Sequence, residues 1–232
     1  ENFKSFISND FSEQFILEKI DSQSILTLTF KTANPIGSLG DNCSTIVNKI
    51  KKCSIFHYLI ESQSISSATI VSHTRWASVG KVSINNCHPI SNVDSFLETS
   101  GGSIYSVLNG DIHNYNSLIK ESKIDLSSMD QDCTTDCLSI PLHLSNIDLS
   151  STEEQIKAFN QFQGSYAIAI QNSLDTNRIL LARKGSQGLY VGISYDNLMF
   201  ASDVYGLVES CRYFKSIESD SLLSLDIENQ PF

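Results

Sequence analysis

Two short segments carry residue types suited to binding a small carboxylate and to stabilising an oxyanion. Arg75 and Trp76 follow a β-branched stretch directly, and a guanidinium fixed at a strand end can bind a carboxylate in bidentate fashion beside an aromatic wall. Asn109 and Gly110 follow a second strand-like stretch, where a side-chain amide and a backbone N–H could form an oxyanion hole. Plainer alternatives stay open, because Arg75 could bridge loops and Asn-Gly is also the commonest hairpin-turn signature.

The cysteine and histidine pairs favour packing over chemistry. Cys87 and His88 are adjacent, and neighbouring residues of an extended segment point to opposite faces. We therefore interpret His88 as structural and keep a hydrolase that uses Cys87 as an alternative. Cys133 and Cys137 would share one helical face, but no second ligand pair stands nearby. The six cysteines form no C-x-x-C pair, so we expect reduced thiols in a cytoplasmic protein.

Composition excludes several partners. The formal net charge is −10, whereas nucleic acid and anionic membrane surfaces both require a cationic face. No apolar run approaches the roughly 18–20 residues of a membrane span. With 232 residues and 41% hydrophobic content, the chain can bury a sizeable core, and one domain is the simplest interpretation.

The elements that must position these residues follow from periodicity and turn signals. Helical spacing predicts helices over residues 10–20, 43–61, 114–122, 136–144 and 152–162, with a helix-like stretch at 203–210. Alternation and β-branched runs predict strands over residues 24–31, 68–72, 103–108, 165–171, 178–183, 189–194, 198–201 and 222–227. Strands and helices do not alternate regularly, which favours an α+β fold with antiparallel sheet.

Several sequence blocks occur together in the order found in one known family. Residues 73–80 (HTRWASVG), 86–89 (NCHP) and 108–114 (LNGDIHN) resemble its blocks H-T-R-W-A-T-H-G, N-A-H-P and H-N-G-I-I-E-N. Residues 162–167 (FQGSYA), 181–186 (LARKGS) and 200–203 (FASD) resemble L-x-G-x-Y/F-A, A-R-x-G-S and F-x-A-S-D. On these blocks the chain resembles the glutaminase domain of class II (N-terminal nucleophile) glutamine amidotransferases, closest to the amidotransferase half of glucosamine-6-phosphate synthase.

The resemblance implies a fold and an activity. The fold would be a four-layer αββα sandwich of two antiparallel sheets, of the N-terminal nucleophile hydrolase type. A single domain would cover residues 1–232, with its first strand upstream or missing. Ammonia released from L-glutamine would pass to a sugar phosphate on an isomerase domain in cis or in trans. The resemblance is compatible with a homodimer and implies no cofactor and no metal.

The resemblance also implies site roles. Arg75 would bind the α-carboxylate of glutamine, while Trp76 and Ser78 would line the pocket. Asn109 and Gly110 would stabilise the oxyanion that forms when the family's N-terminal Cys thiol attacks the side-chain amide.

Three positions depart from the family pattern. No Cys lies near the start of the chain, and the register places the family's nucleophile several residues before Glu1. Val79 stands where the family has His, and Thr134 stands where the family has the Asp that binds the substrate α-amine. A neutral hydroxyl there gives up a charge-assisted bond worth about 1.5–3 kcal/mol, for which Asp132 or Asp136 could substitute. Two functions therefore stay open: a glutaminase domain, or a degenerate glutaminase-like domain with a binding or regulatory role.

Overall fold

The computed structural model divides the chain into two compact units. It describes residues 2–7, 11–20, 23–33, 41–62, 65–75, 78–92, 102–124, 133–195 and 197–226. Unit 1 comprises Glu1–Ile70 with Lys81–Cys87, and unit 2 comprises Val71–Gly80 with His88–Phe232. That residues 1–232 form a single domain stays a prediction, which this division into two units does not test.

Unit 1 combines a small sheet with two helices. Strands β1 (Asn2–Ile7), β2 (Phe11–Ile20) and β3 (Gln23–Thr32) form an antiparallel sheet in the order β1-β2-β3. Helices α1 (Asp41–Lys52) and α2 (Ser54–Glu61) replace the single helix predicted over 43–61. The helical conformation is interrupted between them at Cys53, whose backbone is extended. A 3₁₀ turn, η1 (Ile84–Asn86), completes the described elements of this unit.

The prediction of a helix over residues 10–20 is wrong, because this segment is β2. Its apolar residues fit one helical face, but Phe11, Phe15 and Leu17 also fall on the alternate positions of a strand. The partner decides between these patterns: β2 pairs with β3 along its whole length, from Phe11 opposite Thr32 to the last residue of β2. Cross-strand packing of this kind outweighs local propensity.

Unit 2 contains two antiparallel sheets. The five-stranded sheet has the order β11-β7-β6-β5-β4, and the three-stranded sheet has the order β10-β8-β9. The strands of the larger sheet are β4 (Ile90–Ser91), β5 (Ile104–Ile112), β6 (Gly164–Asn172), β7 (Asp175–Lys184) and β11 (Ser221–Asp226). The smaller sheet comprises β8 (Tyr190–Ile193), β9 (Leu198–Ala201) and β10 (Tyr213–Ser216). The helical elements are α3 (Tyr115–Glu121), η4 (Asp136–Leu138), α4 (Ser139–Leu144), α5 (Thr152–Asn160) and η5 (Val204–Gly206).

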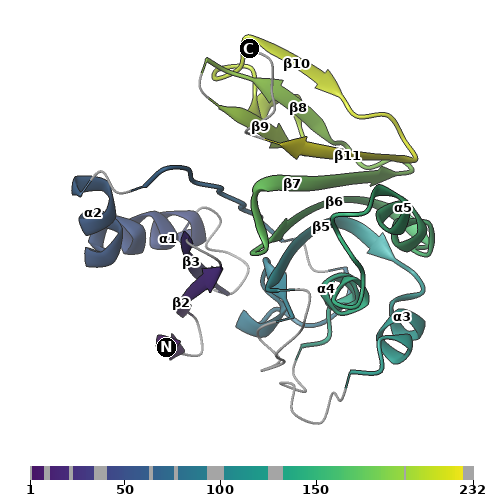
Figure 1. Ribbon diagram of the computed structural model, residues 1–232, viewed down its shortest axis with the longest axis horizontal. Coiled ribbons are helices and arrows are strands. Elements are labelled where there is room, and N and C mark those ends of the chain that lie inside the picture. Colours follow the sequence, from purple (N-terminus) through teal and green to yellow (C-terminus); the bar gives the residue numbers. More distant parts are fainter. Residues whose placement is uncertain are drawn as a thin grey trace. The chain divides into compact units, whose positions relative to one another are not determined.

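The two faces of the larger sheet bury different layers. On β5, Leu108 and Ile112 belong to a core cluster that also contains residues of α3, α4 and α5. Val107, on the opposite face, belongs to a second cluster against which Val191 of β8 and Phe200 of β9 pack. Figure 1 shows the three helices along this sheet and the smaller sheet apart from them. Unit 2 thus has helix, sheet and sheet layers in the order that an αββα sandwich requires, and the α+β prediction with antiparallel sheets is confirmed.

Most predicted elements of unit 2 are confirmed, with differences that concern the site. Residues 68–72, which cross the boundary between the two units, form no strand, and neither β4 nor β10 was predicted. The stretch 203–210 contains only the short 3₁₀ turn η5. The predicted strand ending at residue 108 continues to Ile112, because β5 pairs with β6 up to Ile112 opposite Gly164.

Across the described part of the chain, no helix is long and apolar enough to cross a lipid bilayer.

Candidate functional site

Asn109 lies within β5, close to the end of the strand. Side chains alternate between the faces of a strand, so Asn109 shares the face of Val107, which is buried between the two sheets. Asn109 itself is half-buried. Its amide therefore lies at the rim of the space between the sheets, and it makes no side-chain hydrogen bond to any residue that the structure describes.

The N–H of Gly110 points away from β6. The N–H of Leu108 donates to Nδ1 of His88 at 3.5 Å, and the N–H of Ile112 donates to Oδ2 of Asp136 at 2.8 Å. Both acceptors lie on the edge of β5 that faces away from β6, beyond the end of β4. Backbone N–H directions alternate along an antiparallel strand, so the N–H of Gly110, between these two, points to the same edge. The Gly110 N–H and the Asn109 side-chain amide thus belong to adjacent residues at this end of β5, and an oxyanion hole uses donors of these two kinds.

Gly110 has a backbone that other residues rarely adopt. Its φ is +110°. A Cβ at this position would overlap the carbonyl oxygen of Ser165 and lie 2.9 Å from Cγ of Gln187. Glycine is therefore required here both by backbone conformation and by the close approach of β6. The Asn-Gly pair is an irregularity inside a strand and not the hairpin turn of the alternative interpretation.

Residues 78–80, which follow Arg75 in the chain, lie against the same end of β5. The Ser78 hydroxyl donates to Oδ1 of Asp111 at 2.7 Å. Arg75 donates from its guanidinium to the carbonyl of Val79, which holds the group against its own loop. These bonds join the predicted carboxylate-binding residue to the strand that carries the predicted oxyanion hole.

Thr134 lies beside the same loop. A Cβ on Gly80, whose φ is +79°, would lie only 2.7 Å from Oγ1 of Thr134 and 3.0 Å from its carbonyl oxygen. Thr134 is exposed. Asp111 therefore contacts this loop at Ser78, and Thr134 contacts it two residues later, at Gly80. Trp76, the remaining predicted site residue, lies outside the described residues.

Asp136 is committed to holding the backbone. Its side chain is 4% exposed, and its two oxygens accept from the Ile112 N–H at 2.8 Å and from the Thr135 hydroxyl at 3.4 Å. Burial raises the pKa of Asp136, and the nearby Asp111 carboxylate raises it further, while the Ile112 hydrogen bond opposes both. Of the two substitutes considered for the missing charge at Thr134, Asp136 is thus already engaged, and Asp132 lies outside the described residues.

Two histidines meet beside the strand. The Nδ1 atoms of His73 and His88 lie 3.1 Å apart, and the ring centroids are 4.3 Å apart. Burial lowers the pKa of His73, a hydrogen bond with the Leu108 backbone raises it, and the Arg75 charge lowers it. The pair thus packs against Leu108, which directly precedes Asn109, and the structural interpretation of His88 agrees with this contact.

The cysteine pairs have structural contacts. The Cys87 thiol donates to the carbonyls of Thr32 and Ser83, both at 3.3 Å. Cys137 is fully buried with its sulfur 3.6 Å from the Ser106 hydroxyl. All six cysteines are free thiols.

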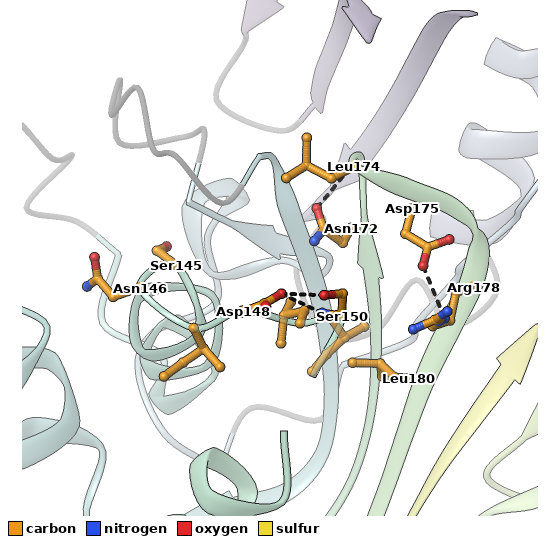
Figure 2. Close-up of a pocket in the computed structure, with 12 residues that line it drawn as sticks. Ser145, Asn146, Asp148, Ser150, Asn172, Leu174, Asp175, Arg178 and Leu180 are labelled. Atoms are coloured by element: carbon orange, nitrogen blue, oxygen red, sulfur yellow. Dashed lines mark hydrogen bonds and ion pairs between the residues drawn. The ribbon is translucent and has the colours of Figure 1, made fainter. Parts of the chain in front are cut away.

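A separate pocket of about 420 Å³ lies at the other end of the sheet. Figure 2 shows its polar wall, where Asp148 accepts from Ser150 and Arg178 pairs with Asp175 at 3.1 Å. Asn172, which lines this pocket, pairs with the first residue of β5, five residues from Asn109. At about 3.3 Å per residue, the pocket lies about 17 Å along the strand from the candidate site. It contains none of the predicted site residues.

The structure therefore brings together all the predicted site residues that it describes. These are Arg75, Ser78, Asn109, Gly110 and Thr134. Sequence reasoning missed Asp111 and the His73–His88 contact. The signal for Asp111 was its position two residues after Asn109, which places both side chains on one face of β5.

Comparison with known proteins identifies the family of this chain. A family model described as "Glutamine amidotransferase domain" matches residues 82–209, more than half of the chain. Curated relatives named glutamine–fructose-6-phosphate aminotransferase (isomerizing) include one from Streptococcus agalactiae, 30% identical over 80% of this chain and 29% of the relative. Another from Clostridium acetobutylicum is 32% identical over 75% of this chain and 27% of the relative. The chain thus spans less than a third of the length of these relatives.

Among solved structures, a glutamine phosphoribosylpyrophosphate amidotransferase from B. subtilis, complexed with ADP and GMP, aligns with a TM-score of 0.47 at 17% identity. The alignment covers 68% of this chain and 34% of that one. The family match, which includes Asn109, Gly110 and Thr134, supports the resemblance drawn from the ordered blocks. The chain belongs to the family of glutamine amidotransferase domains and is related to the glutaminase half of glutamine–fructose-6-phosphate aminotransferase.

Proposed function

We propose that this domain binds L-glutamine and hydrolyses its side-chain amide, releasing ammonia for transfer to a sugar phosphate in the cytoplasm. Arg75 binds the α-carboxylate, with Trp76 and Ser78 beside it. The Asn109 side-chain amide and the Gly110 N–H stabilise the oxyanion formed during attack on the amide carbon. The acceptor sugar phosphate and an isomerase domain, in cis or in trans, belong to the same proposal, as does a homodimer.

The observation that carries this proposal is the edge of β5 beyond β4. There the N–H groups on either side of Gly110 are occupied by His88 and Asp136, while the N–H of Gly110 points outward next to the Asn109 amide. Preorganised donors of this kind favour the charge that develops on the carbonyl oxygen. A Cys thiol must reach this position as the nucleophile, and in the family pattern that thiol belongs to the amino-terminal residue.

A degenerate domain that binds without hydrolysis is the second candidate function. The sequence favours it at Val79 and Thr134, where the family pattern has His and Asp. Thr134 is the stronger argument of the two, because it lies beside Gly80 in the loop that follows Arg75 and contributes no negative charge. In this alternative the domain retains a ligand pocket for glutamine or a sugar phosphate and serves a regulatory role.

A glutaminase assay of the full-length protein tests the first proposal. We expect glutamate and ammonia from glutamine, with turnover lowered about 10²–10³-fold by Asn109→Ala, because one oxyanion donor is lost. Asn116→Ala is the matched control: Asn116 is an exposed residue of α3, and turnover should not change.

Calorimetry separates the two candidate functions. Glutamine and fructose 6-phosphate are titrated separately into the same protein. Binding of either ligand without any release of ammonia would favour the degenerate domain over the glutaminase. Binding of neither ligand would contradict both candidate functions.

A further inference from the structure

The ligand proposed above has a second charged group that needs a partner. At neutral pH glutamine is a zwitterion, and in the proposed site Arg75 pairs only with its carboxylate. An ammonium group that leaves water must gain acceptor oxygens, and a carboxylate is the strongest of these. Thr134 provides only a neutral hydroxyl, so the question is which carboxylate of this chain faces the ligand.

Two described carboxylates lie at this end of β5, Asp111 and Asp136. Asp136 is 4% exposed and already accepts hydrogen bonds at both oxygens. Asp111 is half-buried and accepts one bond, from the Ser78 hydroxyl to Oδ1 at 2.7 Å. An ionised carboxylate has about four acceptor positions, so this bond orients Asp111 and leaves acceptor capacity for a ligand.

The position of Asp111 suits the length of glutamine. Asp111 and Asn109 are two residues apart on one strand, so their side chains share a face about 6.6 Å apart. That spacing is of the order of the distance between the amide and the α-amine of an extended glutamine. A ligand whose amide meets Asn109 thus has its amine close to Asp111, on the side where Ser78 joins the Arg75 loop.

We propose that Asp111 binds the α-ammonium group of glutamine and supplies the negative charge that Thr134 lacks. This inference rests on the proposed glutamine site. It assigns the ligand's amine to β5 instead of to the segment that carries Thr134. Asp111 is thereby the residue that makes the pocket select an α-amino acid over the same molecule without its amine.

The test compares two ligands that differ only in this group. L-Glutamine and glutaramate, which lacks the α-amine, are titrated into the full-length protein at neutral pH. For the wild type we expect a clear preference for glutamine. Asp111→Asn, which keeps the shape and an acceptor for Ser78, should weaken glutamine binding about 10- to 100-fold and leave glutaramate binding unchanged.

Two further variants sharpen the result. Asp175→Asn removes the same charge at the far end of the sheet, where Asp175 pairs with Arg178, and should leave both affinities unchanged. Thr134→Asp, combined with Asp111→Asn, places a carboxylate on the other side of the loop and should restore much of the preference for glutamine.

Each outcome decides the matter. If wild-type protein binds glutamine and Asp111→Asn weakens both ligands equally, or neither, the assignment of Asp111 is overturned while the glutamine site stands. If the wild type binds glutamine no better than glutaramate, Asp111 does not hold the amine. If the wild type binds neither ligand, the proposed function and this inference fail together.

Discussion

Substituting Gly110 with alanine should disrupt the end of β5. The alanine would have to adopt the φ of +110° that Gly110 has, which costs a residue other than glycine about 1–3 kcal/mol. Its Cβ would also overlap the Ser165 carbonyl and crowd Cγ of Gln187 at 2.9 Å, and overpacking of this kind costs about 1–3 kcal/mol. Together these effects predict a loss of about 2–6 kcal/mol in the free energy of unfolding, a large part of the 5–15 kcal/mol typical of a folded domain.

Urea denaturation followed by circular dichroism measures this loss as a shift of the midpoint at an unchanged slope. Gly206→Ala is the matched control, since Gly206 has no positive φ and its Cβ would meet only Ala201 Cβ at 3.1 Å. We expect that change to stay within about 1 kcal/mol of zero. A Gly110→Ala protein as stable as the wild type would refute the argument that β6 leaves no room at this position.

Three further predictions concern the core and its ionisable groups. Phe162→Ala should lower the free energy of unfolding by about 3–5 kcal/mol, because the ring is fully buried, whereas Phe214→Ala, at a ring 47% exposed on β10, should cost about 1 kcal/mol or less in the same denaturation assay. Burial lowers the pKa of His143, so the unfolded chain binds the proton first as the pH falls. The free energy of unfolding should therefore decrease as the pH drops from 6.5 through the folded pKa. In a pH series of melting curves, stability should depend less steeply on pH for His143→Gln than for the wild type. The pKa of Asp136 is instead raised, so its ionisation opposes folding as the pH rises from 3.8 through the folded pKa. Across that pH window Asp136→Asn should become more stable relative to the wild type. Urea melts that show no such gain would refute the sign of this effect.

The sequence predicted the fold class because unit 2 carries strong local signals. Leu108, Ile168 and Leu180 sit in runs of apolar residues bounded by turn residues, and each run is a strand of the five-stranded sheet. Ser151 directly precedes the helix predicted over residues 152–162, and its hydroxyl accepts from the Glu154 N–H at 3.4 Å. Such signals act over a few residues and do not depend on distant partners.

The errors occur where distant pairing decides the structure. Residues 11–20 suit a helical face as well as a strand, and only pairing with β3 separates the two. Three of residues 68–72 are β-branched, but this segment forms no strand, so the propensity is not realised. The length of β5 also depends on β6, which pairs with it through Gly110 and beyond the expected stop.

The candidate site shows the same limit in its charges. A single sequence gave the residue types and the order of the blocks, and these were sufficient to nominate Arg75, Asn109 and Gly110. It gave no sign that Ser78 would bond to Asp111, because 33 residues separate them. The contact depends on how the loop folds against the strand.

The edge of β5 accounts for both proposals with one geometric cause. Among the described residues, β4 pairs only with Tyr105 and Ser106 of this edge, and His88 and Asp136 accept from the N–H groups of Leu108 and Ile112 on either side of Gly110. The strand face at the same point presents Asn109 and Asp111 together, because they are two residues apart. An amide carbonyl and an ammonium group in one ligand can therefore both be bound by a single short stretch of β5. On the proposed assignment, a pocket built on this strand takes its charge partner from Asp111 and needs no carboxylate at Thr134.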